Sequence, residues 1–515
     1  MRLSLRTALL ICFIGLLASG CATNPVTGKT ELTLVSEAEE IAIGQQQYLP
    51  AQQAQGGQYK VDEQLTRYVN TVVERLAAVS DRPLPYEIVV INDSTPNAWA
   101  LPGGKMAINR GLLLELENEA ELAAVLGHEI IHAAARHGAK SVERSMLLQG
   151  AIMLTAIGSQ DAEYGNYIVG AAGLGAQLIA QKYGRNAELE ADLYGMEYMA
   201  RAGYDPAAAI SLQEKFVALS KGRQTRWLQG LFASHPPSAE RVQQNRETAT
   251  RIKAENLRDW ETGEVRYRNA LTYLASKADA YQAFDQARTL VSNKSLDVAA
   301  GRVNQAIRQE PKEARFYGLK ADILMRQDSF DEAIATYSRA LAADSSYYEY
   351  YLGRGLAYAR KGERTKARAD LESSNQLLPT AMATNELGNL ALATGKRSAA
   401  KRYYAEVAQS GGPLAQSARL AYVRLDLPEN PAPYFRTSSG LRSGNFYAVI
   451  SNQSGLALGA VNVLISARIN GELKSVRRQL GPMSAGSTKS VYPGWKIAGD
   501  DVVGAVDVRL TQVSL

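Results

Sequence analysis

The sequence predicts a multidomain, mainly α protein. An α+β domain comes first, an α-solenoid of helical repeats follows, and a small β-sandwich-like domain ends the chain. The 515 residues exceed the usual size of one domain. Small residues recur with a helical-repeat spacing between about 280 and 412, and apolar residues alternate with polar ones after 440.

The composition is that of an ordinary folded protein. Hydrophobic residues make up 46% and charged residues 21% of the chain, which excludes a mainly disordered polypeptide. The net charge of +5 is too small to indicate a nucleic-acid partner. With two cysteines in the chain, a disulfide-rich scaffold and a four-cysteine metal site are excluded.

Residues 1–20 have the pattern of an export signal, with two arginines, an apolar run and small residues before Cys21. The segment 17–21 resembles a bacterial lipobox, so we expect cleavage before Cys21 and lipid on that residue. An ordinary cleaved signal and an uncleaved anchor helix are the alternatives. Ala22 indicates the outer membrane by the sorting convention of Gram-negative bacteria. Outside the leader no run of eighteen apolar residues occurs, which excludes a polytopic membrane protein.

The first domain is expected over residues 21–270. Its predicted elements are a short helix around 36–48, an amphipathic helix over 61–76, strands at 87–91 and 105–109, and a long helix over about 117–149. Residues 150–180 are rich in glycine and alanine but too polar to span a bilayer, so we expect packed helices or a mobile lid there.

An internal repeat predicts the second domain, residues 271–425. Ala299, Ala333, Ala367 and Ala400 are spaced by 34, 34 and 33 residues. Another small residue precedes each alanine by twelve positions, and a larger apolar residue follows each by four. Small residues let the two helices of a hairpin approach, while larger ones fill the space between hairpins. This pattern is typical of tetratricopeptide repeats, with a generic helical bundle as the alternative.

The composition changes again after the prolines near 428–433. Apolar and polar side chains alternate from Val461 to Ile469, and Asn470-Gly471 follows as a two-residue hairpin turn. We therefore expect a β-rich domain over 435–515 that has a binding or packing role and no chemistry of its own.

One motif predicts chemistry. His128-Glu129-Ile130-Ile131-His132 lies in the long predicted helix, where residues four apart share a face, so both imidazoles can meet one ion. Zinc takes nitrogen and carboxylate ligands and can keep one position open for water. Glu129 would lie near that water, where it could take a proton and later return it to a leaving amine. His137 lies off this face and is expected to make a packing or surface contact.

A catalytic zinc needs a third protein ligand, and the segment Glu188-Leu189-Glu190-Ala191-Asp192 supplies candidates in a second predicted helix. Glu188 and Asp192 share a face. Glu188 can bind the metal while Asp192 holds the other nitrogen of a ligand histidine, which we expect to be His128. Glu190 is the competing candidate for the third ligand, but it points about half a helical turn away from Asp192. A solvated acidic helix face is the alternative.

The motifs HEIIH at 128–132 and ELEAD at 188–192, with Ser234-His235-Pro236-Pro237 and Arg241 further on, resemble the three sequence blocks of the HtpX/CAAX-protease-type zinc metallopeptidases. The resemblance covers about residues 24–260. It implies a gluzincin-like α+β domain that holds one zinc ion per chain.

Carried over onto this sequence, the resemblance implies that the zinc ligands are His128, His132 and Glu188. Glu129 would then be the general base, and His235 and Arg241 would stabilise the oxyanion of a tetrahedral intermediate. In one member of the family that also has repeats, the matching histidine can instead occupy the open position of zinc, so His235 could also silence the enzyme. A plain helix-start residue before two prolines is the alternative for His235.

The segment 97–104, Asn-Ala-Trp-Ala-Leu-Pro-Gly-Gly, matches the block that precedes the substrate-lining edge strand of this family. The substrate-binding residues implied by the match are Asn97, Ala98, Gly103, Gly104 and Lys105. We expect an extended substrate beside the strand 105–109, completing the edge of the sheet. Recognition through the main chain predicts weak side-chain selectivity and a preference for unfolded segments.

Together these predictions describe a zinc endopeptidase of the bacterial envelope, lipid-anchored and facing the periplasm, whose repeats bind substrates or partners. The resemblance implies misfolded or stalled envelope proteins as substrates and outer-membrane assembly machinery as a partner. One alternative is an assembly factor or scaffold that works through residues 280–412 and has latent protease activity. An intramembrane prenyl-protein protease is disfavoured because no spanning segment accompanies the motifs.

Overall fold

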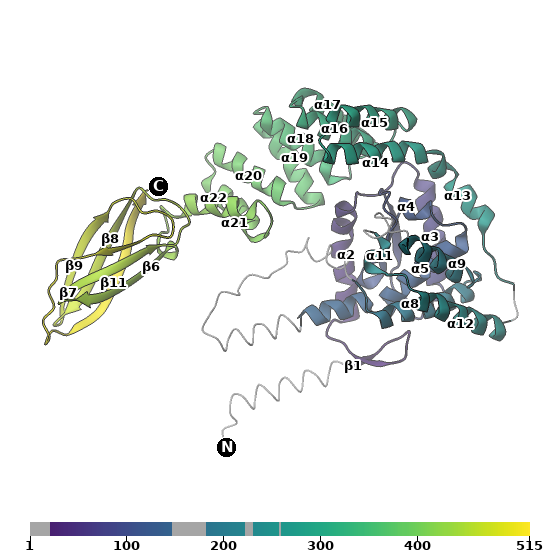
Figure 1. Cartoon of the computed structure of the whole chain (residues 1–515), viewed down its shortest axis with the longest axis horizontal. Coiled ribbons are helices and arrows are strands. Elements are labelled where there is room, and N and C mark those ends of the chain that lie inside the picture. The colour runs from purple at the N-terminus through teal and green to yellow at the C-terminus, as the bar shows by residue number, and fades with distance from the viewer. Residues whose placement is uncertain (1–20, 147–181, 222–229, 257–258, 515) are drawn as a thin grey trace, which may run out of the picture. The chain divides into compact units, whose positions relative to one another are not determined.

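The computed structural model describes residues 21–146, 182–221, 230–256 and 259–514 (Figure 1). The predicted leader and the segment 150–180 lie outside these residues. None of the described helices is long and apolar enough to cross a membrane. The chain forms two compact units that divide close to Glu363, just before helix α19 (Arg364–Leu377). The predicted mainly helical, multidomain architecture is confirmed.

A three-stranded sheet forms the centre of the first unit. It consists of β3 (Glu87–Ile91), β4 (Ala98–Ala100) and β5 (Lys105–Asn109) in the spatial order β3-β5-β4. β5 pairs in parallel with β3 and antiparallel with β4, and all of its residues are buried. The prediction that 105–109 lies at the edge of the sheet is therefore wrong. This strand is central because β3 and β4 occupy both of its sides, and β4 is an edge.

Alternate residues of β4 direct their main-chain groups away from β5. The amide of Leu101 donates to the carbonyl of Lys105 at 2.7 Å. Hydrogen-bonded and non-hydrogen-bonded pairs alternate along an antiparallel ladder. Ala98 and Ala100, opposite Ile108 and Met106, are non-hydrogen-bonded pairs, so their amide and carbonyl groups point outward from the sheet.

Short elements and helices surround this sheet. A two-stranded ribbon of β1 (Cys21–Thr23) and β2 (Thr30–Leu32) comes first, and a 3-10 turn, η1 (Pro102–Gly104), joins β4 to β5. The helices that precede the repeats are α2 (Glu37–Ala54), α3 (Glu63–Ala77), α4 (Arg110–Leu113), α5 (Glu119–Ala134), α8 (Arg185–Arg201), α9 (Ala208–Lys221), α11 (Leu231–Ser234) and α12 (Ala239–Glu255).

The long helix expected over 117–149 is interrupted. α5 ends at Ala134, Arg136 adopts a left-handed conformation with φ of 63°, and the chain is helical again over 137–146. The guanidinium of Arg136 donates to Glu40 Oε2 at 3.0 Å. A contact with a segment far away in sequence thus stabilises a conformation that arginine rarely adopts.

The predicted repeats form helical hairpins. The first unit contains α13 (Glu264–Ser276), α14 (Ala278–Ser292), α15 (Leu296–Gln309), α16 (Ala314–Arg326), α17 (Phe330–Ala343) and α18 (Tyr348–Arg360). The second unit contains most of α19 (Arg364–Leu377), and α20 (Ala381–Ala393), α21 (Arg397–Gln409) and α22 (Ala415–Asp426). A Cβ on Gly353 would lie 2.2 Å from Tyr337 Cζ, so only glycine fits at that helix contact.

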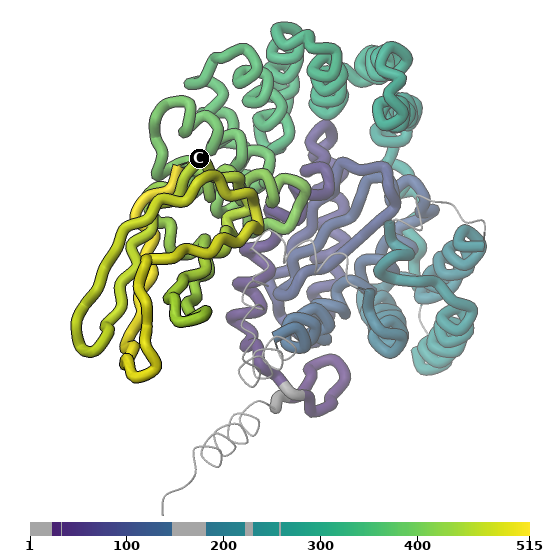
Figure 2. The backbone as a smooth tube through the Cα atoms, turned by 60° about the vertical axis from the view of Figure 1, so that its left-hand side comes forward, coloured from purple at the N-terminus to yellow at the C-terminus, as the bar shows by residue number. Residues whose placement is uncertain are grey.

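Within the first unit, Glu313 binds the repeats to the preceding domain. Figure 2 shows the teal repeat helices beside the purple and blue domain that holds the sheet. Both carboxylate oxygens of Glu313 accept from Asn92 Nδ2 at 3.0 Å, and Oε2 also accepts from Tyr281 at 2.7 Å. Arg110 donates to Asn92 Oδ1 at 2.8 Å and lies 3.5 Å over the ring of Tyr281. Glu313 and Arg110 are each 1% exposed, so these polar groups depend on one another.

Replacing Glu313 with alanine should destabilise the first unit by about 2–4 kcal/mol. The change removes the acceptor for Asn92 and Tyr281 and takes away one of the carboxylates that compensate buried Arg110. Urea unfolding followed by circular dichroism measures the effect. Glu332→Ala, at an exposed position on α17, is the control and should leave stability unchanged. Equal stability of the two variants would show that the Glu313 contacts contribute nothing.

The C-terminal domain consists of two three-stranded sheets that share one apolar core. Its strands are β6 (Phe435–Arg442), β7 (Asn445–Asn452), β8 (Ala460–Ile469), β9 (Glu472–Leu480), β10 (Thr488–Val491) and β11 (Val503–Ser514). The predicted alternation holds along β8, where every second side chain is buried. Asn470 and Gly471 have φ of 52° and 84°, as a two-residue hairpin turn requires.

Candidate metal centre

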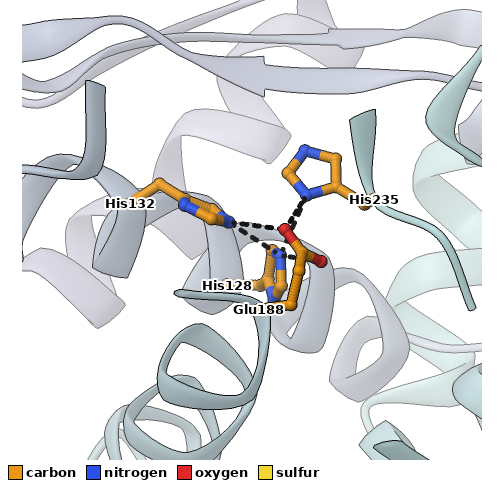
Figure 3. A group of neighbouring side chains, drawn as sticks. All are labelled: His128, His132, Glu188 and His235. Atoms are coloured by element: carbon orange, nitrogen blue, oxygen red, sulfur yellow. Dashed lines mark hydrogen bonds and ion pairs between the residues drawn. The ribbon is translucent and has the colours of Figure 1, made fainter. Parts of the chain in front are cut away.

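Four buried side chains converge between α5, α8 and the end of α11 (Figure 3). They are His128 and His132 on α5, Glu188 on α8 and His235 after α11. One candidate ligand atom from each lies within 4.8 Å of the others. His132 Nε2 is 3.0 Å from His128 Nε2, and His235 Nδ1 is 3.0 Å from Glu188 Oε1. The structure thus brings together the three predicted ligands and His235.

Two glycines let α5 and α8 approach closely enough to build this group. A Cβ on Gly127 would lie 3.1 Å from the carbonyl oxygen of Gly195, and a Cβ on Gly195 would lie 3.1 Å from the amide nitrogen of His128. Larger side chains at either position would push the helices apart. Helical spacing puts His128 and His132 on one face of α5. The close approach of α8 to α5 then brings Glu188 within reach of both histidines.

Electrostatic effects favour the ligand forms of these groups. Burial alone would raise the pKa of Glu188, but the charge of His235 and hydrogen bonds from histidines outweigh burial and hold that pKa well below its usual value. Burial holds the pKa of His132 well below its usual value. Glu188 is therefore a carboxylate and His132 a neutral imidazole, each with a lone pair available for a metal ion.

The pKa of His235 is shifted in the opposite direction from that of His132. Burial would lower the pKa of His235, but the carboxylates of Glu188 and Glu129 outweigh burial and raise it. Its Nε2 lies 3.4 Å from Glu129 Oε1. An imidazole in these surroundings can donate a hydrogen bond when protonated and can act as a ligand when neutral.

The donor set fits a zinc ion. Zinc binds imidazole nitrogens and carboxylate oxygens, and catalytic sites use three protein ligands and keep a position for water. Glu129 is 2% exposed, and its Oε2 has no hydrogen-bond partner among the residues that the structure describes. Leaving a buried carboxylate oxygen unpaired is costly, and a water molecule beside the ligands would satisfy it.

Asp192 and Arg241 contact the candidate ligands on the side that faces away from the group. Asp192 Oδ1 lies 2.9 Å from His128 Nδ1, the ring nitrogen that faces away from the other ligands. Arg241 donates to both oxygens of Asp192 at 2.6 and 2.7 Å, and its Nη1 lies 2.9 Å from Glu188 Oε2. Two carboxylates therefore engage the guanidinium. These contacts hold Asp192 and Glu188 in place, and the oxyanion contact of Arg241 stays a prediction.

Two further rings contact His132. His137 is buried, with its Nδ1 2.9 Å from His132 Nδ1, and Tyr183 stacks on His132 with ring centroids 4.0 Å apart. A surface contact for His137 is therefore wrong, because the break at Arg136 turns this residue back toward α5. A histidine five positions after the motif was the available signal for His137, whereas no pattern marked Tyr183.

The predicted substrate-binding residues lie in two places. Asn97 and Ala98 are at the edge strand β4. Gly103 and Gly104 form the turn η1 with φ of 77° and 89°, and Lys105 begins the central strand. These three residues therefore do not line an open edge, because the turn and β5 are covered by neighbouring elements.

A cavity of about 50 Å³ with a largely apolar lining adjoins the centre. His128, Glu129 and His235 line part of its wall, as do the polar side chains of Asp192, Arg241 and Asn245. The apolar lining residues are Ala124, Val125, Ala191, Met196, Met199, Ala209, Leu212, Phe216 and Leu231. Gln213 also lines the cavity, and its buried Nε2 has no partner within the described part of the chain. The arrangement offers space for an apolar side chain next to Glu129.

Comparisons with known proteins agree with this geometry. Residues 63–249 match peptidase family M48, and residues 284–348 and 324–379 match tetratricopeptide repeats. A beta-barrel assembly-enhancing protease of Yersinia pestis is 26% identical over 366 residues, covering 65% of this chain and 73% of that protein. The protein of the same name from Escherichia coli K12 is 27% identical over 334 residues, or 64% of each.

A mitochondrial enzyme shares the first domain. The metalloendopeptidase OMA1 of Schizosaccharomyces pombe is 36% identical over 180 residues, which cover 34% of this chain and 51% of that protein. The segment matched by peptidase family M48 contains all four converging residues. The predicted combination of metallopeptidase domain and repeats is confirmed at this level. The chain therefore carries a peptidase family M48 metallopeptidase domain followed by tetratricopeptide repeats.

Proposed function

We propose that this chain is a zinc-dependent endopeptidase of the bacterial envelope that cleaves misfolded or stalled proteins, with repeats that bind these substrates or partner proteins. The buried convergence of three candidate ligands beside Glu129, whose Oε2 has no hydrogen-bond partner among the described residues, carries the proposal. The family M48 match supports the reaction. The names of the bacterial relatives support a role connected with outer-membrane barrel assembly.

The zinc ligands would be His128, His132 and Glu188. A bound zinc ion would supply Lewis-acid polarisation of a water molecule and of the peptide carbonyl. Glu129, buried beside the ligands, would take the proton of the attacking water and return it to the leaving amine. Asp192 would hold the His128 ring in place from its other nitrogen.

The position of the His235 ring would determine whether the centre is active or inhibited. Its Nδ1 lies 3.2 Å from His128 Nε2 and 3.0 Å from Glu188 Oε1, so this nitrogen sits among the candidate ligand atoms. We propose that His235 is the fourth ligand in this arrangement and that the ring must move before a substrate can bind. Once moved, it could donate to the oxygen of the tetrahedral intermediate. The position of His235 is the specific observation that favours the second candidate function, a repeat-based assembly factor with latent protease activity.

Substrate binding would use the edge strand β4. Ala98 and Ala100 are 0% and 8% exposed, so the segments that cover this edge would have to move before the outward main-chain groups could pair with an extended, unfolded segment. The cavity beside Glu129 would take one side chain next to the scissile bond. Its volume of about 50 Å³ corresponds to roughly three or four water molecules, similar to an aliphatic side chain. We therefore propose sequence-tolerant binding with one preference, for a mid-sized apolar residue.

The location in the cell rests on sequence pattern. The leader over 1–20 supports export, and Cys21 supports lipid attachment with a place at the outer membrane, facing the periplasm. The mass of the mature amino-terminal peptide tests the lipid on Cys21, because an unmodified cysteine would exclude this anchor.

Digestion of casein by the purified protein tests the proposed function. We expect hydrolysis that stops when a chelator removes the metal and returns when zinc is added, because the ligands bind zinc only in their deprotonated, folded arrangement. A folded, zinc-loaded protein that never cleaves casein would contradict the protease. If a Glu129→Gln variant also supports envelope integrity in cells as well as wild type does, the repeat-based assembly factor would be the function.

A further inference from the structure

A line of three side chains runs outward from the metal centre. His132 Nδ1 lies 2.9 Å from His137 Nδ1, and His137 Nε2 lies 3.1 Å from Glu190 Oε1. His132 and His137 are 1% and 6% exposed, whereas the side chain of Glu190 is 18% exposed. A buried candidate ligand is thus connected through a second buried ring to a carboxylate close to the surface.

The break between α5 and the next helical segment creates this line. In an unbroken helix, a residue five positions further on lies about 140° around the axis, so His137 could not meet the ring of His132. The left-handed Arg136 starts the next segment in a new direction. Its guanidinium donates to Glu40 and Glu143 at 3.0 and 3.5 Å, which stabilises the turn.

The neighbours of each ring determine where its proton lies. His132 Nε2 faces His128 Nε2 at 3.0 Å and Glu188 Oε1 at 3.5 Å, so its lone pair points to the candidate metal position. A neutral imidazole carries one proton, which must then be on Nδ1 of His132, the donor to His137. His137 accepts at Nδ1 and carries its own proton on Nε2. From there it donates to Glu190, which can only accept.

We propose that His137 and Glu190 are positioning residues that orient His132 as a metal ligand, an inference that rests on the proposed zinc centre. A carboxylate behind a ligand histidine fixes its tautomer and orientation and increases the basicity of the ligand nitrogen. His128 has such a carboxylate in direct contact, Asp192 at 2.9 Å. His132 reaches its carboxylate through one additional ring. Helix α8 then supplies one ligand and both supporting carboxylates.

Two substitutions of His137 separate positioning from packing. Glutamine keeps an oxygen that can accept from His132 and an amide that can donate to Glu190, whereas leucine fills space without either group. We expect His137→Leu to weaken zinc binding 10- to 100-fold and His137→Gln to stay within about threefold of wild type. Competition with a chromophoric chelator measures the affinity. In excess zinc, His137→Leu should lower kcat for casein with little change in KM.

A second pair of variants covers the case in which His137→Leu fails to fold. Glu190 is partly exposed, so Glu190→Leu should fold, and it should weaken zinc binding while Glu190→Gln retains an acceptor and binds more tightly than the leucine variant. Glu197→Leu, on the same helix but paired with Arg251 at the surface, is the control and should bind zinc like wild type.

Two outcomes would overturn this inference. One is wild-type zinc affinity in folded His137→Leu and Glu190→Leu. The other is equal weakening by leucine and glutamine at both positions, which would reveal packing alone. Failure of the proposed function would look different, because wild-type protein would then bind no zinc. Normal zinc binding by wild type and by every variant would remove only the positioning role.

Discussion

Replacing Glu129 with glutamine is expected to lower kcat for casein hydrolysis by roughly 10²–10⁴-fold, the usual contribution of a general base. Glutamine keeps the size of the side chain but cannot take a proton from the attacking water. Glu129 is not a predicted ligand, so the zinc content of the variant should remain that of wild type. Initial rates with a fluorescent casein, together with metal analysis of the same sample, measure both quantities.

The matched control for this substitution is Glu117→Gln. Glu117 precedes α5, its side chain is 71% exposed, and it pairs with Lys215 at 2.9 Å. This variant loses the same charge without touching the centre and should retain wild-type activity. A Glu129→Gln protein with more than about a tenth of the wild-type kcat would mean that another group takes the proton.

Replacing Glu188 with alanine should remove most of the bound metal, from about one zinc ion per chain to almost none after dialysis. The expected site has three protein ligands, and loss of one leaves too few contacts to hold the ion. The carboxylate also compensates Arg241, whose Nη1 lies 2.9 Å from Glu188 Oε2. His128→Ala should lose zinc to a similar degree. Metal analysis by mass spectrometry provides the measurement, and circular dichroism shows whether each variant is folded.

The control for the metal loss is Glu197→Ala on the same helix. Glu197 pairs with Arg251 at 2.7 Å on the surface, so this variant tests the effect of removing an acidic residue from α8. It should keep its zinc. A folded Glu188→Ala protein that keeps a full complement of zinc would show that the third ligand lies elsewhere, and the proposed centre would have to be abandoned.

Local periodicity predicted two pairs of residues in the centre, whereas His235 was predicted only through the family resemblance. The spacing of four between His128 and His132, and again between Glu188 and Asp192, places each pair on one helix face. The structure brings these faces together where Gly127 meets α8. Such pairs can be found from sequence because they depend on helix geometry alone, and the partner helix has to supply only one more ligand.

Other contacts could not be predicted, because they depend on segments far apart in the chain. Ala135 and Arg136, the two residues at the break, favour helix by propensity. The turn depends on the contact between Arg136 and Glu40. The contact of His137 with the centre could therefore not be predicted from the sequence. The order of the sheet is a similar case. Apolar character predicted β3 as a buried strand and the turn at 102–104 predicted a second strand at β5, but the pairing that makes β5 central is formed only in the fold.

The buried contacts of Glu313 also determine how this protein can be divided and recombined. A protease fragment cut before α13 would expose Arg110, which is 1% exposed in the chain, and would leave Asn92 without its acceptor. A chimaera that exchanges the repeat array for another should therefore retain the native sequence at least through Arg315, whose Nη1 donates to the carbonyl of Asn92 at 2.5 Å. A fusion point close to Glu363, where the first compact unit ends, would leave these contacts intact.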